Sequence, residues 1–289
     1  MTPLVVSLLL AAALAHATWN ALLKGRRGEP LAASAGLAAT WAVLGAPLLL
    51  FFEPPAPEAY PYLAASIVVH LVYFSLLVAA YRVADLSVVY PIARGVPPLL
   101  VAGIGWAAAA ERVPALGIGG VALVVGGVLT LGFARAPEKA DAPDAESRRR
   151  RGVLLALATA GFIAGYTVID GLGARAARAP FGYWLWLTVI QGALFAAGAM
   201  LVGGAEVRRA VWRRRGAGVI AGVLSAGGYA VALWAMTLAP LAFVSALRET
   251  SVVFAAAIGA YTLKEPFGRR RIVAALLVAA GVVAIQLSG

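Results

Sequence analysis

Long apolar runs separated by short polar stretches dominate this sequence. They fall at 2–23, 30–52, 60–82, 86–110, 114–134, 152–173, 180–203, 215–238, 240–262 and 269–288. Each run has about the 20 residues that a helix needs to cross the hydrocarbon core of a bilayer, and none alternates with the two-residue period of a strand. A helix also satisfies its own backbone hydrogen bonds in lipid. The pattern therefore predicts an all-α integral membrane protein with ten transmembrane helices.

One long polar stretch interrupts this pattern at 135–151. It contains two prolines, four acidic residues and four consecutive arginines, which is typical of a solvated linker. The linker divides the chain into residues 1–134 and residues 152–289, with five expected helices in each. The first apolar run imitates a signal peptide, but no Lys or Arg precedes it, so we interpret it as the first helix.

The two halves are related in sequence. At an offset of 154 residues, six residues of the first half fall on identical residues of the second: Arg94 on Arg248, Glu111 on Glu265, Ile118 on Ile272, Val124 on Val278, Gly127 on Gly281 and Val128 on Val282. Because each half has an odd number of crossings, the second copy enters the membrane from the opposite side. Such inverted repeats recur in secondary transporters, with the substrate site near the midplane.

Composition narrows the function further. The chain is 62% hydrophobic and 13% charged, with a mean hydropathy of +0.88, which excludes an ordinary soluble domain. Its net charge of +11 lies mostly in short loops and indicates topology rather than nucleic-acid binding. It has no cysteine and two histidines 54 residues apart, so we expect no metal site and no cofactor.

Two arginines inside the apolar runs are the strongest binding candidates. Arg94 and Arg248 each lie about eight residues into their run, which places both near the midplane at 1.5 Å per residue. A guanidinium group can bind a carboxylate or phosphate bidentately. The alternative is a structural role, with Glu249 and Asp170 as ion-pair partners. Neighbouring candidates for lining the same site are Tyr90, Ser245, Ser251, Asn20, Trp19 and Tyr166.

The run at 86–110 also contains Pro91, Pro97 and Pro98. Each proline removes a backbone donor and bends a helix. Freed carbonyls are tolerated at membrane depth only inside protein or beside water, so these prolines predict a gate, or else a kink used only for packing.

Three ionisable side chains are candidates for coupling transport to protons. Glu249 can exchange a proton, or pair permanently with Arg94 or Arg248. His16 shares a helix face with Trp19 and Asn20, and Asp170 lies near a helix end, where it could simply be solvated.

The turns at 110–114 and 264–268 carry a family resemblance. They read AERVP and KEPFG, and each precedes a Gly- and Ala-rich apolar run. With ten expected helices in two copies, the chain resembles the EamA repeats of the drug/metabolite transporter superfamily. The resemblance implies a secondary transporter, often an exporter, and not an enzyme. At these turns we interpret Glu111 and Glu265 as acceptors for the backbone N–H groups that begin the next helix.

We therefore expect a multi-pass transporter of the bacterial inner membrane that exports a small metabolite with an anionic group, such as an amino acid or organic acid. The alternatives are a drug exporter, a flippase for an anionic lipid carrier, or a membrane-embedded hydrolase. The expected partners are the substrate and membrane lipids, without nucleic acid, and the expected oligomeric state is a monomer or homodimer.

The distribution of Lys and Arg predicts the orientation. The odd-numbered loops carry 19 of these residues and the opposite loops three. Because cytoplasmic loops are enriched in positive charge, we expect cytoplasmic odd loops and periplasmic termini, although several relatives are thought to keep both termini in the cytoplasm. A C-terminal reporter that is active only in the cytoplasm should be inactive when fused to this chain, and an active fusion would contradict the orientation.

Overall fold

The structure of the protein, a computed structural model, describes residues 1–24, 30–83, 86–132, 145–263 and 269–288. All regular secondary structure in these ranges is helical. Eight segments in them are long and apolar enough to cross a membrane: Pro3–Leu22, Leu31–Leu50, Pro91–Ala109, Glu146–Ala176, Pro180–Val202, Arg215–Leu238, Leu241–Ile258 and Arg269–Leu287. The prediction of an all-α membrane protein is confirmed.

The helices follow one another without a strand in the described ranges. The first half contains α1 (Pro3–Lys24), α2 (Pro30–Gly45), α3 (Tyr60–Val83), α4 (Leu86–Gly95), α5 (Pro97–Ala109) and α6 (Ala115–Gly132), with 3-10 turns η1 (Ala46–Leu50) and η2 (Pro57–Ala59). The second half contains α7 (Ala145–Ala176), α8 (Pro180–Val202), α9 (Gly204–Arg213), α10 (Arg215–Leu238), α11 (Leu241–Glu249), α12 (Ser251–Leu263) and α13 (Arg269–Leu287).

Two boundaries differ from the sequence-based expectation. Residues 145–151, expected as linker, form the first turns of α7. Arginine is a good helix former, so these residues extend the helix beyond its apolar part. The stretch after α8, expected as a loop, forms the amphipathic helix α9. Its Val207 and Ala210 are buried against Ala35 of α2 and Ala199 of α8. The count of ten crossings stays a prediction.

The fourth apolar run of each half is broken near its middle. In the first half α4 ends at Gly95 and α5 begins at Pro97, as the prolines predict. In the second half α11 ends at Glu249 and α12 begins at Ser251, without any proline. Thr250 bridges this break, since its N–H and its Oγ1 both contact the Leu247 carbonyl oxygen, at 3.2 and 2.6 Å.

The helix packing repeats across the two halves. α1 packs against α10, and the equivalent helices with the halves exchanged, α7 and α3, also pack against each other. The second helices of the two halves, α2 and α8, pack together as well. α6 packs antiparallel to α13 through glycines. A Cβ atom on Gly127 would meet Val278 and the Ala274 carbonyl, and one on Gly281 would meet Val124 and the Gly120 carbonyl. At the offset of 154 residues these are the same two contacts.

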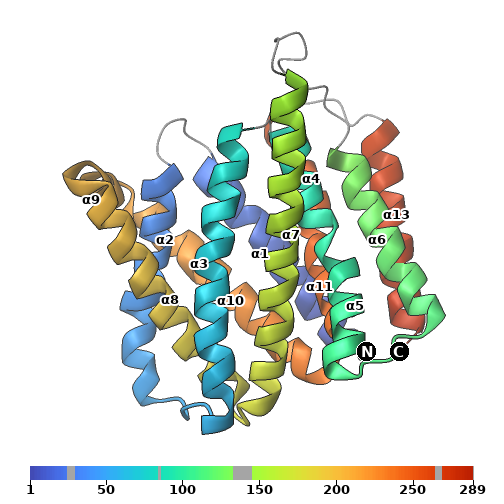
Figure 1. The fold of residues 1–289 in the computed structure, drawn as a ribbon, viewed down its shortest axis with the longest axis horizontal. Coiled ribbons are helices and arrows are strands. Elements are labelled where there is room, and N and C mark those ends of the chain that lie inside the picture. The colour runs from blue at the N-terminus through green and yellow to red at the C-terminus, as the bar shows by residue number, and fades with distance from the viewer. Residues whose placement is uncertain (25–29, 84–85, 133–144, 264–268, 289) are drawn as a thin grey trace.

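The two ends of the helix bundle differ (Figure 1). Both chain termini lie at one end, together with the α5–α6 turn and the beginning of α11, and the end of α6 and the beginning of α7 lie at the other. α9 lies near this second end. Nearly all of α11 is buried, and it belongs to a core that also includes residues of α1, α3, α6, α7, α8 and α10.

The α6–α13 contact can be tested with two neighbouring glycines. A Cβ at Gly127 would lie 2.6 Å from Val278 Cγ2 and 2.8 Å from the Ala274 oxygen, whereas one at Gly126 would meet no heavy atom within 4 Å. We expect Gly127→Ala to lower the unfolding free energy by about 1–3 kcal/mol through overpacking. Gly126→Ala should leave it unchanged or raise it slightly. Thermal melts of the purified variants measure the difference, and equal melts would contradict the contact.

Candidate functional site

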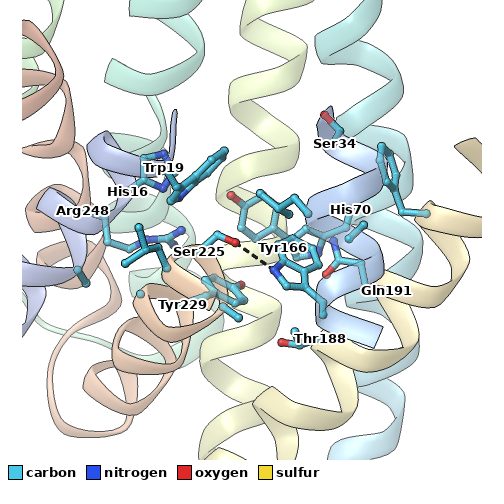
Figure 2. A pocket seen from close by; sticks show the side chains of 18 of the residues that line it. His16, Trp19, Ser34, His70, Tyr166, Thr188, Gln191, Ser225, Tyr229 and Arg248 are labelled. Atoms are coloured by element: carbon cyan, nitrogen blue, oxygen red, sulfur yellow. Dashed lines mark hydrogen bonds between the residues drawn. The ribbon is translucent and has the colours of Figure 1, made fainter. Parts of the chain in front are cut away.

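A cavity of about 190 Å³ lies between helices of both halves. Its described walls come from α1, α2, α3 and α4 of the first half and from α7, α8, α10 and α11 of the second. Figure 2 shows that Arg248, Tyr229, Tyr166 and His70 project into one space with His16 and Trp19. The polar and aromatic lining residues are His16, Trp19, Ser34, Trp41, His70, Tyr73, Arg94, Tyr166, Thr188, Gln191, Phe195, Ser225, Tyr229 and Arg248.

The last turn of α11 holds Arg248 on the wall of the cavity. A cation is favourable there because the carbonyl end of a helix carries partial negative charge. Its Cζ lies 5.1 Å from the centre of the Tyr229 ring, a cation–π contact. No described carboxylate oxygen lies within 4.0 Å of its nitrogens. The cavity therefore has a guanidinium group on its wall that an anion can pair with.

Arg94, the equivalent residue of α4, differs from Arg248 in having a carboxylate partner. Its Nε lies 2.9 Å from Oε2 of Glu249, and the two side chains are 11% and 5% exposed. Glu249 is not among the described cavity-lining residues. Of the alternatives for Glu249, the structure therefore contains the ion pair with Arg94.

Aromatic rings form much of the remaining wall. The His70 ring stacks on Tyr166 at a centroid distance of 4.0 Å, and Tyr73 contacts Tyr166 edge to face at 5.6 Å. His16 and Trp19 pack edge to face at 5.0 Å. The Trp19 Nε1 is buried without a hydrogen-bond partner in the described part of the chain, so this donor is available to a bound molecule.

Asp170 lies behind this wall rather than at a solvated helix end. It is fully buried, and the hydroxyl of Tyr229 donates to its Oδ2. The hydroxyl of Tyr183 donates to its Oδ1 at 3.2 Å. The expectation that Asp170 could simply be solvated is wrong, because the last turns of α7 continue past it and α8 and α10 cover it.

Other predicted site residues lie elsewhere. Ser245 and Ser251 are buried and are not among the described lining residues, and the Asn20 amide donates to the His16 carbonyl of its own helix. The side chain of Tyr90 lies outside the described residues. Pro91 is buried inside α4, and Pro97 and Pro98 are buried at the start of α5. Trp184 donates a hydrogen bond from Nε1 to the Ala226 carbonyl at 3.0 Å.

Sequence reasoning missed part of the cavity. Trp41 reaches it from α2 and donates to Ser225 Oγ at 3.0 Å, the bond drawn in Figure 2. The pairing of Tyr229 with Arg248 was also missed, because these side chains come from different helices. The available signal was helical spacing: Thr188 and Gln191 are three residues apart and Ser225 and Tyr229 four, so each pair shares a helix face.

Comparison with known proteins identifies the family of the second half of the chain. Residues 150–287 match the EamA-like transporter family. The second half of the chain belongs to this family. A crystal structure of a protein 17% identical to this chain superposes with a TM-score of 0.76 and covers 99% of this chain and 98% of its own, a likeness that concerns the fold. No curated protein matches the sequence. The family and the apolar helices together make this a membrane transporter of the drug/metabolite type.

A latch joins the two halves of the transporter at the end that holds its termini. Glu111, in the α5–α6 turn, accepts a hydrogen bond from Arg175 Nη2 at 2.6 Å and another from the Leu241 N–H at 2.9 Å. Arg175 also donates to the carbonyls of Met236 and Ala239. The expectation that Glu111 accepts from the start of its own next helix is corrected, because it accepts from the start of α11. Glu265 lies outside the described residues.

Weakening the latch should open this end of the transporter. The chain has no cysteine, so Ser225→Cys introduces a single thiol into the cavity. In Glu111→Gln, loss of about 1.5 kcal/mol from a charged hydrogen bond should raise labelling of this thiol about tenfold. The reagent is a membrane-impermeant thiosulfonate, applied to vesicles of both orientations, and the increase is expected only from the face with the termini.

Glu58→Gln is the matched control. Its partner Arg178 is 3.8 Å away and both side chains are mostly exposed, so this pair contributes little. Equal labelling in the two variants would show that the Glu111 latch does not close this end.

Proposed function

We propose that this protein is a secondary transporter that exports a small metabolite with an anionic group, an amino acid or organic acid, by alternating access. The observation that carries the proposal is Arg248, whose guanidinium group faces the cavity without a described carboxylate partner. An arginine held near the middle of the membrane is costly, by about 2.5–3.5 kcal/mol on insertion scales. An anionic substrate would offset that cost.

Inverted repeats support alternating access. The corresponding helices α6 and α13 run antiparallel. The contact that Gly127 of α6 makes with α13 is equivalent to the contact that Gly281 of α13 makes with α6. Both halves also break their fourth apolar run just after an arginine, at Arg94 and Arg248. Broken helices near the midplane, at the interface of two repeats, are the usual surroundings of a transporter substrate site.

The described conformation favours access from the end opposite the termini. α11 and the Glu111 latch close the end with the termini, whereas Ser34 and Phe195 extend the cavity wall toward the other end. That other end carries the arginines at the start of α7, along α9 and at the start of α13, and the rule of positive charge inside makes it the cytoplasmic end. The conformation is then the one that receives substrate from the cytoplasm of a bacterial cell.

A groove gives the lipid alternative a specific basis. About 470 Å³ of space lies between α1, α2, α9 and α10, lined by apolar residues such as Leu22 and Val211 and by Arg213 and Arg214. Ser34 and Leu37 of α2 line the cavity near this groove. A lipid entering sideways would use this route.

A ligand screen by thermal stabilisation tests the proposal. The detergent-purified protein is heated with amino acids, organic acids, phosphonates, nucleobases and cationic drugs in turn. A ligand of the folded form at about 100 times its Kd adds about 2.7 kcal/mol of stability. We expect a small carboxylate to stabilise the protein and Arg248→Ala to lose the effect.

Arg178→Ala is the control, because this arginine is exposed and is not among the described residues that line the cavity. Its ligand shift should equal that of the unmodified protein. Stabilisation by cationic or apolar compounds alone, unchanged in Arg248→Ala, would replace the anion by a drug or lipid substrate. Stabilisation by a carboxylate that survives in Arg248→Ala would move the site away from this residue.

A further inference from the structure

Asp170 is a buried carboxyl group that anion binding at Arg248 does not use. It is fully buried on α7, and it is not among the described residues that line the cavity. No described Lys, Arg or His nitrogen lies within ion-pair distance of it. An ionised carboxyl inside the membrane is costly without such a partner. Asp170 thus differs from Glu249, which has Arg94 at 2.9 Å.

A short chain of contacts joins Asp170 to the cavity. The Tyr229 hydroxyl donates a hydrogen bond to Asp170 Oδ2. The Cζ atom of Arg248 lies 5.1 Å from the centre of the same Tyr229 ring. Tyr229 and Arg248 both line the cavity, side by side in Figure 2. One phenol therefore contacts both the carboxyl group and the cation to which the substrate is proposed to bind.

The remaining titratable groups around Asp170 come from several helices. His70 lies nearby on α3, beside Ser66, and its Nδ1 is 2.9 Å from the Ser66 carbonyl oxygen. Since a carbonyl only accepts, Nδ1 carries hydrogen and Nε2 remains as the atom that can take up a proton. Tyr183 reaches Asp170 from α8, and Arg248 lies on α11, beyond Tyr229.

The charges of these groups balance in one protonation state. Arg94 and Glu249 cancel as a pair. Arg248 and an ionised Asp170 cancel through Tyr229, which leaves no net charge for an anion to neutralise. A proton on Asp170 leaves one positive charge at Arg248, and a bound monoanion restores neutrality.

We propose that Asp170 is the proton-binding site of this transporter, connected to the cavity by Tyr229, and that its proton and an anion at Arg248 are bound together. The inference rests on the proposed function. It assigns coupling to Asp170 rather than to Glu249, whose carboxylate is paired with Arg94, or to His16, whose described ring contact is with Trp19.

Infrared difference spectroscopy tests the site without any substrate. Spectra of the protein in phosphatidylcholine vesicles are recorded while the pH falls from mildly alkaline to mildly acidic. Protonation of Asp170 should produce a carboxylic C=O band that shifts in D2O and is lost in Asp170→Asn. The matched control is Glu249→Gln, which alters the other buried carboxyl and should keep the band.

Tyr229→Phe keeps the test valid if Asp170→Asn fails to fold. Removing one hydrogen bond from the carboxyl group should leave the band present but at a higher frequency. A band that is lost in Glu249→Gln instead, or no band that responds to pH and to Asp170→Asn, would overturn the assignment. Because no ligand is added, these outcomes are independent of whether the thermal screen finds an anion.

Discussion

The cost of placing charge in hydrocarbon governs the organisation of this protein. Each arginine or carboxyl group inside a span costs a few kcal/mol unless a partner or a cavity receives it. The structure meets this constraint in three ways. Arg94 pairs with Glu249, Arg248 faces the cavity across the Tyr229 ring, and Asp170 accepts two phenolic hydrogen bonds. These four ionisable groups therefore lie around one cavity.

Two broken helices make this arrangement possible. A continuous α-helix uses all its backbone groups internally, whereas a break leaves carbonyls that attract cations. Arg94 and Arg248 lie in the last turns of α4 and α11, beside the breaks. In the first half prolines produce the break, and in the second Thr250 stabilises it by bonding the Leu247 carbonyl. The same geometry thus follows from two different local sequences.

The amino-acid sequence predicted the fold better than the site. Apolar runs of sufficient length indicate spans directly, and the 154-residue offset relates Gly127 to Gly281 before any contact is seen. Side-chain pairs between distant helices carry no such signal. Tyr229 with Asp170, and Glu111 with Arg175 and Leu241, are separated by 59 to 130 residues and depend on packing. Helix α9 was missed because arginines lower its hydropathy without weakening its helix propensity.

The two halves share a plan but are not in the same conformation, and the proposed alternating access would act through that difference. α11 is packed against α5 and α6, where Glu111 of the first half caps its start. Its counterpart α4 also packs against α6 and α7, but within the described ranges it has no comparable contact with α12, the equivalent of α5. If α11 and α4 exchanged these environments, the closed end of the protein would open and the other end would close. The cavity between Arg94 and Arg248 would not need to move. The substrate site can then remain fixed while the half-helices around it change partners, and the contacts at the α6–α13 glycines can serve as the unchanging support.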